Sequence, residues 1–428
     1  MENAVIETKY PITFRQKDAL SLGGQLKNRH SVVLIGMKRV GISNFLRFFL
    51  NHRDIVETYI ADNNQHLFIP VDLNDLVEKE VYPFWILTLK RIGDMVEKFS
   101  KEEALKKDIE NLFLDSIQSK DTFKTLENLR KVLIRITDSG ILPTIFFIRF
   151  DRLKDMVTQE LFGNLQGLKD VTHHKLAYVF TSFRSLDGLS PAVFPKSSLP
   201  VFAQDLYVKP AQKQDIEIIF DSYKDRYKLS LAEALKNSLF ELVDGYVQYL
   251  QLALISLHER NKSIKDKDEL FALLSKDERI ILQSEELWES LEPGEKEVLL
   301  KVANNQKVAP EEERVASYLW NTGFINDGGL FSQLFSHYLK IVEVKNENHD
   351  VELSKKENLL FNFLKTKLGQ ICEREEIIKA VWAEVEELGV SDWAIDRLVA
   401  RLRSKLKAKK SSFEIVTVKT RGYKIITV

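Results

Sequence analysis

The segments SDWAIDRLVARLRSKL, residues 391–406, and VTVKTRGYKI, residues 416–425, decide how the C-terminal part of the chain folds. Ser391 or Asp392 can cap the first turn of a helix. The apolar residues that follow recur at helical spacing and predict one buried face, made of Ile395, Leu398, Val399, Leu402 and Leu406. The second segment alternates with a period of two and is broken at Gly422, which predicts a short hairpin.

Positive charge is concentrated in this region. From Arg397 to Lys424 there are ten Lys and Arg residues and one acid, Glu414. The whole chain carries a net charge of -1, so the remainder is net acidic. Such asymmetry is typical of nucleic-acid binding, in which neutralised phosphates release counterions. A solvated basic helix has the same charge pattern, so charge alone leaves both interpretations open.

Three motifs in order carry a family resemblance: LSKKENLL at 353–360, CEREEIIKAVW at 372–382, and the helix and hairpin above. Together they resemble the OmpR/PhoB-type winged-helix domain. Ser354 and Glu357 also form a capping-box pattern, which supports a helix start there.

The resemblance implies that the basic helix enters the major groove of DNA and that the hairpin, or wing, touches the backbone or the minor groove. It makes Arg397, Arg401 and Arg403 candidates for base or phosphate contacts. Lys405, Lys419 and Arg421 are then mainly phosphate contacts. Thr420 stands where the family usually has Gly, so a differently shaped wing tip is expected. The spacing of the large aromatic residues favours core positions over stacking platforms, for Trp382, Trp393 and Tyr423.

Near the N-terminus, the apolar run Ser31–Ile35 is followed by GMKRVGISN at 36–44 and an amphipathic segment at 45–50. Strand, glycine loop and helix are the context that a phosphate-binding loop requires, because the first helical amides must point at the anion. Ile42 stands where such a loop has its lysine, which removes a point charge needed for hydrolysis. Lys38 or Arg39 could supply a substitute cation. The candidate nucleotide-binding residues are Gly36, Lys38, Arg39, Gly41, Ser43 and Asp151.

FRQKD at 14–18 is similar to the entry segment of AAA+ and STAND-type P-loop proteins. In that family a buried strand ends in an Asp-Glu pair before a Phe-Asp-Arg-Leu-like turn, and this chain has TIFFIRFDRL at 144–153. In one register Ile148 and Arg149 replace the acids and Asp151 is a turn residue; in the other, Asp151 is a magnesium ligand followed by Arg152. Both registers lack the water-activating carboxylate.

A third strand at 175–184 resembles the sensor strand of the same folds. Thr181, Ser182 or Arg184 could approach a phosphate there, although polar residues at a strand end are also ordinary loop punctuation.

The expected fold is an α/β P-loop domain with a parallel sheet and helices on both faces, a helical lid, and two winged-helix (α+β) domains. The domains are expected at 1–205 for the degenerate AAA+/STAND-like part, 206–280 for the lid and linker, 281–340 for an internal winged-helix-like domain and 341–428 for the OmpR/PhoB-type domain. Glu295–Asn304 and Glu311–Trp320 are the expected helices of the internal domain, 324–331 its hairpin, and Lys340–His349 a strand or linker.

Composition sets the remaining expectations. A hydrophobic content of 44% and a charged content of 29% are ordinary for a globular protein. The single cysteine, Cys372, and the absence of a signal core or membrane span predict a cytoplasmic protein that does not bind membranes. No residue pattern predicts a metal site.

These observations predict a sequence-specific regulator of transcription that binds double-stranded DNA. Its P-loop-like domain has lost ATP hydrolysis and serves sensing of an effector or partner, or assembly of a homo-oligomer. The protein is therefore not expected to be an enzyme, and ATP with Mg is a doubtful ligand. Two alternatives stay open: a STAND-type nucleotide-dependent switch or ATPase, and a scaffold for protein interactions.

Overall fold

The computed structural model describes residues 5–190, 202–224, 227, 229–260, 264–326, 329–348, 353, 355–382, 392–409, 411–418 and 421–427. The chain divides into two compact units, Met1–Tyr338 and Leu339–Val428. Among the described residues, no helix combines the length and the apolar character needed to cross a membrane.

The first unit is built on a five-stranded sheet in the order β2-β3-β4-β1-β5, in which every neighbouring pair is parallel. Its strands are β1 (Ser31–Ile35), β2 (Gln65–Asp72), β3 (Ile141–Ile148), β4 (Ala177–Ser182) and β5 (Ala203–Tyr207). This confirms the predicted parallel sheet. The sequence signals singled out β1, β3 and β4 but not β2 or β5. Pro70 interrupts β2, and the exposed polar residues Gln204 and Asp205 interrupt β5.

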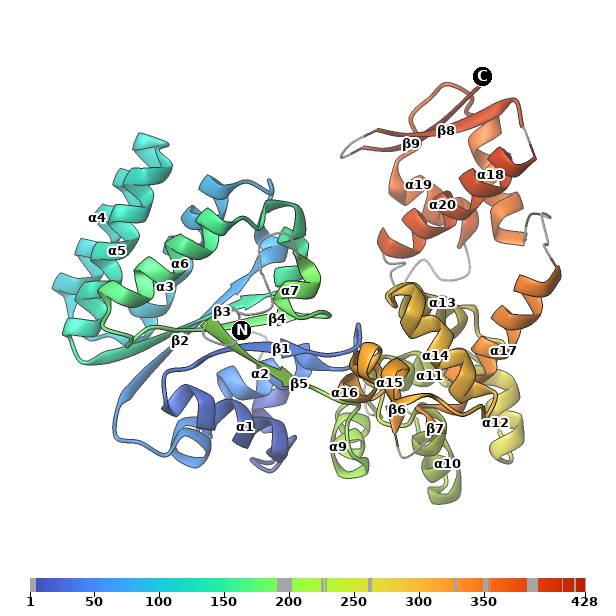
Figure 1. Cartoon of the computed structure of the whole chain (residues 1–428), viewed down its shortest axis with the longest axis horizontal. Helices are drawn as coiled ribbons and strands as arrows, with labels where there is room; N and C mark the ends of the chain where they lie inside the picture. The colour runs from blue at the N-terminus through green and yellow to red at the C-terminus, as the bar shows by residue number, and fades with distance from the viewer. Residues whose placement is uncertain are drawn as a thin grey trace. The chain divides into compact units, whose positions relative to one another are not determined.

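Helices cover both faces of this sheet, as predicted (Figure 1). One face carries α1 (Gln16–Lys27) and α2 (Ile42–Asn51), and the other carries α3 (Val81–Phe99), α5 (Thr122–Asp138) and α6 (Gln159–Val171). Short helices complete this half: η1 (Ile6–Lys9), η2 (Val56–Ile60), η3 (Leu73–Asp75), η4 (Phe150–Met156) and α7 (Leu186–Leu189).

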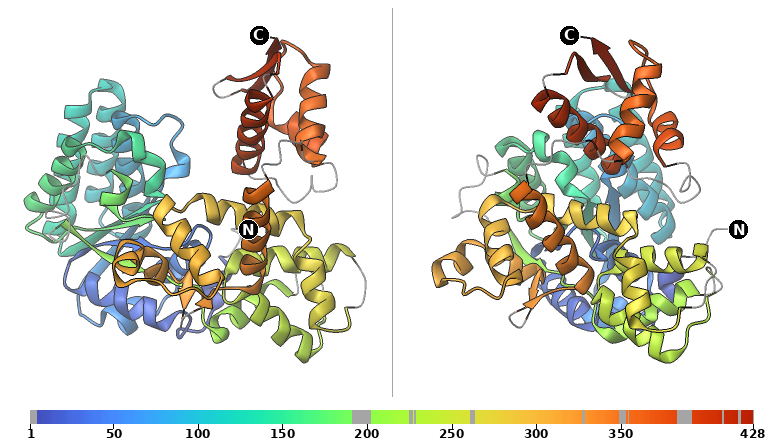
Figure 2. Two further views of the ribbon diagram at one scale, coloured as in Figure 1. Left: turned by 45° about the vertical axis from the view of Figure 1, so that its right-hand side comes forward. Right: turned by 90° about the vertical axis from the view of Figure 1, so that its right-hand side faces the viewer.

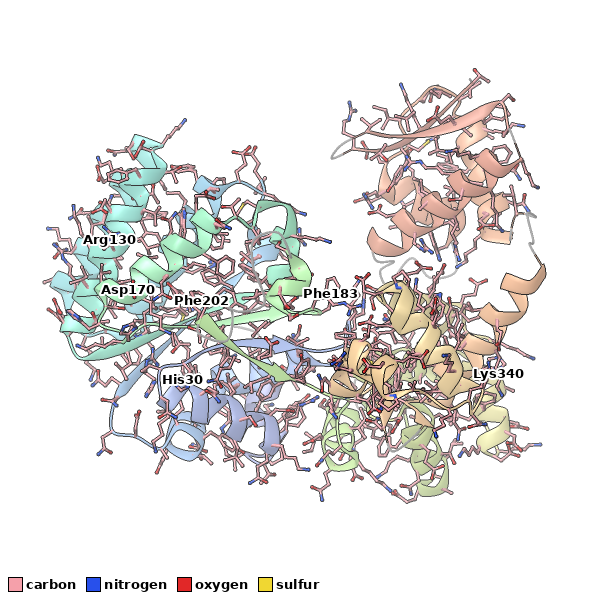
Figure 3. All side chains as sticks on the ribbon, in the orientation of Figure 1. His30, Arg130, Asp170, Phe183, Phe202 and Lys340 are labelled. Atoms are coloured by element: carbon pink, nitrogen blue, oxygen red, sulfur yellow. The ribbon has the colours of Figure 1, made fainter. Side chains whose placement is uncertain are left out.

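Aromatic residues fill the core on the α6 side of the sheet. Phe147 stacks on Phe180 at a centroid distance of 5.6 Å, and Tyr178 stacks on Phe202 at 6.1 Å (Phe202 is labelled in Figure 3). Phe150, two residues after the end of β3, is fully buried against Phe180. This core fixes the ends of β3 and β4, where the candidate phosphate-binding residues lie.

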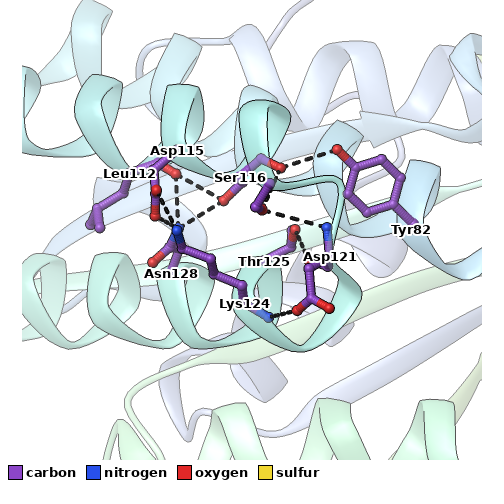
Figure 4. Close-up of polar contacts among 9 residues, drawn as sticks. Tyr82, Leu112, Asp115, Ser116, Asp121, Lys124, Thr125 and Asn128 are labelled. Carbon is purple, nitrogen blue, oxygen red and sulfur yellow. Dashed lines mark hydrogen bonds and ion pairs between the residues drawn. The ribbon is translucent and has the colours of Figure 1, made fainter.

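A polar network joins α4 (Glu103–Ser119) to α5 in a helical hairpin (Figure 4). The side-chain amide of Asn128 donates to Asp115 Oδ2 at 2.9 Å and to Ser116 Oγ at 3.0 Å. Asp121 caps α5 by accepting from the Lys124 amide at 2.7 Å. Because Asn128 is buried, these hydrogen bonds are needed to offset its desolvation.

The rest of the first unit is helical, with α9 (Lys213–Lys224), α10 (Glu233–Val243), α11 (Val247–Arg260), α12 (Lys267–Leu274) and α13 (Glu278–Glu289). Next come α14 (Pro293–Ala303), α15 (Pro310–Val315), α16 (Ser317–Thr322) and a two-residue hairpin of β6 (Ile325–Asn326) and β7 (Gly329–Leu330). The expected hairpin is present, and its tip at 327–328 lies outside the described residues.

Two boundaries differ from the sequence prediction. The segment Glu311–Trp320 is two helices, because Ala316 leaves helical geometry at φ -96° and ψ 22° and is buried. The segment Lys340–Asn348 is helical and not a strand, because it belongs to α17 (Gln333–Asn348), within which the boundary between the two units falls. Buried Leu334, Phe335 and Leu339 lie along the first half of α17, and helix propagates beyond them at little cost.

The second unit contains α18 (Lys355–Thr366), α19 (Arg374–Val381), α20 (Asp392–Ala408) and an antiparallel hairpin of β8 (Phe413–Val418) and β9 (Gly422–Thr427). Figure 2 shows the hairpin packed beside the three helices. The apolar residues predicted for one face of α20 are all buried. Trp382 and Tyr423 are core residues as predicted, whereas the Trp393 side chain lies outside the described part.

Gly422 fixes the join between the hairpin and the segment before α19. Its φ is +138°, and a Cβ there would lie 2.1 Å from the Cys372 carbonyl oxygen. The close approach allows Cys372 and Tyr423 to exchange backbone hydrogen bonds of 2.8 and 3.0 Å. The glycine that breaks the alternation in the sequence is therefore required by the backbone.

Candidate nucleic-acid interface and phosphate loop

The solvent-exposed face of α20 includes fewer basic residues than the number of Lys and Arg in its sequence suggests. Asp396, Ser404 and Lys407 are exposed, and Ala400 between them is half-buried. These residues are spaced three or four apart and form one stripe along the helix. Lys407 is the cation of this stripe, and it was not among the predicted DNA-binding residues.

Arg397, Arg401 and Lys405 form a neighbouring stripe, since they are four residues apart. The Lys405 Nζ lies 2.9 Å from Glu357 Oε2, and the Arg401 Nε lies 3.7 Å from Glu357 Oε1. Glu357 is in the first turn of α18, and its side chain is only 2% exposed. Two of the predicted DNA-binding cations are thus turned toward one buried carboxylate.

Arg403 joins α20 to the wing. Its Nε donates to the Ile415 carbonyl at 2.7 Å, and its Nη2 donates to Thr417 Oγ1 at 2.8 Å. Both acceptors belong to β8, whose other side pairs with β9. The guanidinium therefore caps the outer edge of the hairpin, where unpaired backbone groups would otherwise be exposed.

A polar cluster ties Tyr423 of β9 to α19 and α20. The Tyr423 hydroxyl donates to Asp396 Oδ1, which also forms an ion pair with Arg374 at 2.6 Å. Burial and the hydrogen bond to Asp396 raise the pKa of Tyr423 to about 12, so its hydroxyl remains a donor at neutral pH. The cluster holds one end of the exposed stripe in place.

At the wing, Arg421 is exposed, and its amide donates to the Val418 carbonyl at 3.1 Å to close the turn. Arg421 therefore lies at the hairpin turn, as predicted, and its contact with phosphate stays a prediction. Lys419 and Thr420 lie outside the described residues.

In the first unit, the loop 36–41 connects β1 to α2, as predicted. Gly41 has φ +115° and precedes the helix directly. A Cβ on Gly36 would lie 2.7 Å from the Val208 carbonyl oxygen, and one on Gly41 would lie 2.7 Å from Val247 Cγ2. Both glycines are needed because other segments pack closely against the loop.

The loop is also tied to the helical half of the unit. The Tyr246 hydroxyl donates to the Lys38 carbonyl at 2.5 Å, and the Arg39 Nε donates to Glu286 Oε2 of α13 at 3.0 Å. The Lys38 ammonium lies 4.9 Å from the ring centroid of Phe183, at the end of β4 (Phe183 is labelled in Figure 3). Both candidate substitute cations thus have contacts inside the protein. Ser43, in the first turn of α2, is half-buried.

At the end of β3, the backbone favours the register in which Asp151 is a turn residue. Phe150 and Leu153 are buried and anchor the turn in the core. Arg149 has φ +63°, its amide donates to Thr181 Oγ1 at 2.7 Å, and its side chain pairs with Asp72. Burial raises the pKa of Asp151, an effect that Lys38 and Arg149 oppose.

Arg184, which follows β4, forms an ion pair in which both side chains are largely buried. Its two Nη atoms donate to both carboxylate oxygens of Glu295 at 2.6 and 2.7 Å. Glu295 in α14 is 7% exposed, and the guanidinium also lies 3.9 Å from the ring centroid of Tyr318. Arg184 thus connects the sheet to α14 and α16, which gives it a structural role.

The carboxylates that hold these cations were missed by sequence reasoning. Glu286 and Glu295 are more than one hundred residues from their partners, and no local pattern marks them. Glu357 was noticed only as a capping residue. Among the described residues, no group of three or more His, Cys, Asp or Glu side chains could hold a metal ion.

Residues 347–425 match the family model described as "Transcriptional regulatory protein, C terminal". A search of curated proteins finds no match to the chain.

Several solved structures are distantly similar. A Walker-type ATPase of Pyrococcus abyssi is 16% identical, with 78% of this chain and 99% of that chain covered and a TM-score of 0.49. The ADP form of the Aeropyrum pernix ORC2 protein is 10% identical, with 80% and 88% covered and a TM-score of 0.44. Domain III of the Thermotoga maritima replication initiation protein DnaA is 18% identical, with 63% and 94% covered and a TM-score of 0.35. Since all three are distant, the role of the first unit is drawn from its own residues.

Proposed function

We propose, from the match of residues 347–425 to the C-terminal domain of transcriptional regulatory proteins, that this chain binds double-stranded DNA sequence-specifically and regulates transcription. The observation that carries the proposal is this match over a unit with a winged-helix element order. The exposed stripe of α20 is the surface that enters the major groove, and the wing tip contacts the backbone.

Within this surface, the residues have different roles. Lys407 and Arg421 are exposed and contact phosphate, and Ser404 and Ala400 lie where base edges are reached. Arg403 holds the wing through β8, while Arg401 and Lys405 face Glu357. Arg397 lies one turn before Arg401, and the family match keeps it as a candidate for a base contact.

The first unit serves sensing or assembly without ATP hydrolysis. In support, Ile42 replaces the loop lysine, Arg149 follows β3 in place of an acid, and Arg39 pairs with Glu286. The helices α14–α16 with the β6–β7 hairpin act as an internal winged-helix-like module, and Arg184 connects this module to the sheet. A change in the first unit would act on transcription by changing how the DNA-binding domains are presented.

A nucleotide-dependent switch is the second candidate, and one observation favours it. The Arg15 side chain is 3% exposed, and its Nη1 has no hydrogen-bond partner among the described residues. This atom lies 3.6 Å from where a Cβ on Gly41 would be. A buried donor beside the loop is suited to an anion. Saturable ATP binding lost in Arg15→Gln would support the switch.

The proposal is tested by fluorescence anisotropy with the full chain and mixed-sequence DNA duplexes at several salt concentrations. We expect affinity to fall linearly on a log–log plot with salt, and the slope to shrink by about 0.9 in Lys407→Gln and in Arg421→Gln. Glu414→Gln changes an exposed acid on β8 and serves as a charge control. Absence of binding at low salt, or a flat salt response, would contradict the proposal and favour a protein-interaction scaffold.

A further inference from the structure

Glu357 lies inside the domain and pairs with two of the three cations in the stripe of Arg397, Arg401 and Lys405. Its two carboxylate oxygens face different partners, Lys405 at 2.9 Å and Arg401 at 3.7 Å. The carboxylate is 2% exposed, whereas Arg401 and Lys405 are 32% and 27% exposed. The two cations therefore reach the surface, and the acid does not.

This difference in exposure means that only the cations can change partner. A buried carboxylate cannot lose its positive partners without a large desolvation cost. A lysine ammonium on a four-carbon stem can turn toward solvent without movement of the helix backbone. DNA phosphate offers a similar anionic oxygen on the outside of the same helix. Glu357 and a DNA phosphate can therefore compete for the same two cations, Lys405 and Arg401.

We infer that Glu357 is an internal competitor of DNA phosphate, which withholds Lys405 and Arg401 from the DNA backbone and so limits non-specific binding. This inference rests on the proposed DNA binding. Phosphate contacts carry affinity without sequence information, whereas base contacts discriminate. Withholding two phosphate contacts lowers affinity for every sequence by the same factor, and it leaves the exposed stripe of α20 as the main determinant of the complex.

For the variant Glu357→Gln, this proposal and a purely structural role of Glu357 predict different changes in DNA affinity. If Glu357 only supported the fold, Glu357→Gln would weaken DNA binding or leave it unchanged. As a competitor, its loss frees cations for phosphate and strengthens binding to mixed-sequence DNA. The log–log salt slope should steepen by about 0.9 for each cation that turns to phosphate.

The experiment is a double-mutant cycle in the full chain, with Glu357→Gln, Lys405→Gln and the double variant titrated against mixed-sequence duplex DNA across a salt series. Lys405→Gln alone should leave the salt slope unchanged, because Lys405 is held by Glu357. In the Glu357→Gln background it should reduce the slope by about 0.9. Glu414→Gln removes one exposed acid from the same domain and corrects for net charge. Hydrogen exchange over residues 392–427 verifies that each variant is folded.

The outcomes separate the two claims. If the parent chain does not bind DNA, the proposed function fails. If the parent chain binds and Glu357→Gln binds no more tightly than Glu414→Gln, the competition fails while the DNA-binding function stands. If Glu357→Gln does not fold, the single variant Lys405→Gln still tests the inference. A clearly smaller log–log salt slope in that variant would show that Lys405 already contacts phosphate in the parent chain, which overturns the inference.

Discussion

At the scale of single residues, buried carboxylates determine which cations are available to a ligand. Glu286, Glu295 and Glu357 each hold a basic residue that the sequence alone associates with phosphate. Each acid is nearly inaccessible to solvent, so its ion pair is difficult to break. Basic residues near a phosphate motif therefore cannot be counted as ligand contacts without their partners.

Arg184→Ala should destabilise the first unit strongly. The substitution leaves the Glu295 carboxylate buried without its main partner, which costs about 3–5 kcal/mol when one member of a buried pair is removed. The matched control is Arg314→Ala, because the Arg314–Glu311 pair is 79% exposed on both sides and should contribute little. Urea denaturation of the full chain measures both. Equal small effects would show that the pair is not structural.

Gly422→Ala should destabilise the second unit by about 1–3 kcal/mol or more, because alanine at positive φ is strained and its Cβ would meet the Cys372 carbonyl. The control is Gly167→Ala in α6, which has open space around it and should be neutral or stabilising. Faster hydrogen exchange in β9 would report the effect. Unchanged exchange would mean that the backbone there relaxes easily.

At the scale of elements, the hydrogen bonds of Arg403 connect α20 to β8, so we expect the two elements to stabilise each other. Arg403→Ala removes two hydrogen bonds from a charged donor, each of which contributes about 1.5–3 kcal/mol. We expect faster hydrogen exchange in β8 together with weaker DNA binding. Lys407→Ala, which changes a residue of the exposed stripe one turn further along α20, should weaken DNA binding without changing hydrogen exchange. If both variants left exchange unchanged, Arg403 would be a DNA contact only.

The phosphate loop gives a second prediction at this scale. The loop residues are tied to Tyr246, Val247 and Glu286, and the loop lysine is replaced by Ile42. We expect no ATP hydrolysis by the full chain and no rise in its unfolding temperature with ATP and Mg²⁺. A ligand at one hundred times its Kd would add about 2.7 kcal/mol to stability, so binding would be detected readily. Such a rise would favour the nucleotide-dependent switch.

Local patterns predicted many elements of the fold. The buried run at Ser31–Ile35, the glycine loop after it and the amphipathic period of α20 each appear where expected, because short-range spacing determines them. β2 and β5 were missed because Pro70 in β2 and the exposed Gln204 and Asp205 in β5 disfavour a strand, although pairing with neighbouring strands in the sheet stabilises both. The continuation of α17 was missed for a similar reason, since polar residues extend a helix anchored by Leu334 and Phe335.

The candidate sites were predictable in position but not in detail. The basic helix, the wing and the phosphate loop lie where the motifs indicated. The partners of Arg39, Arg184 and Lys405 come from segments that are distant in the sequence, so residue spacing does not predict these ion pairs. The exposure of Lys407 was not predicted, because charge density does not show which face of a helix remains exposed.

At the scale of the whole molecule, the chain combines a sheet-based unit with a separate C-terminal unit that matches a transcription-regulator domain. The sensing or assembly that we propose for the first unit would use the edge where its parallel strands end, since open α/β sheets bind ligands there. Homo-oligomer formation through this unit stays a prediction. Analytical ultracentrifugation with and without DNA would show whether DNA recruits more than one copy.

The most direct measurement is a selection of duplexes from a random-sequence library by the full chain, followed by sequencing. We predict enrichment of one motif, and loss of that motif in Arg397→Ala or in an Ala400→Glu variant of the exposed stripe. Each specific base contact should contribute about 1–3 kcal/mol of discrimination. Recovery of duplexes without any common motif, or no recovery at low salt, would contradict sequence-specific DNA binding by this protein.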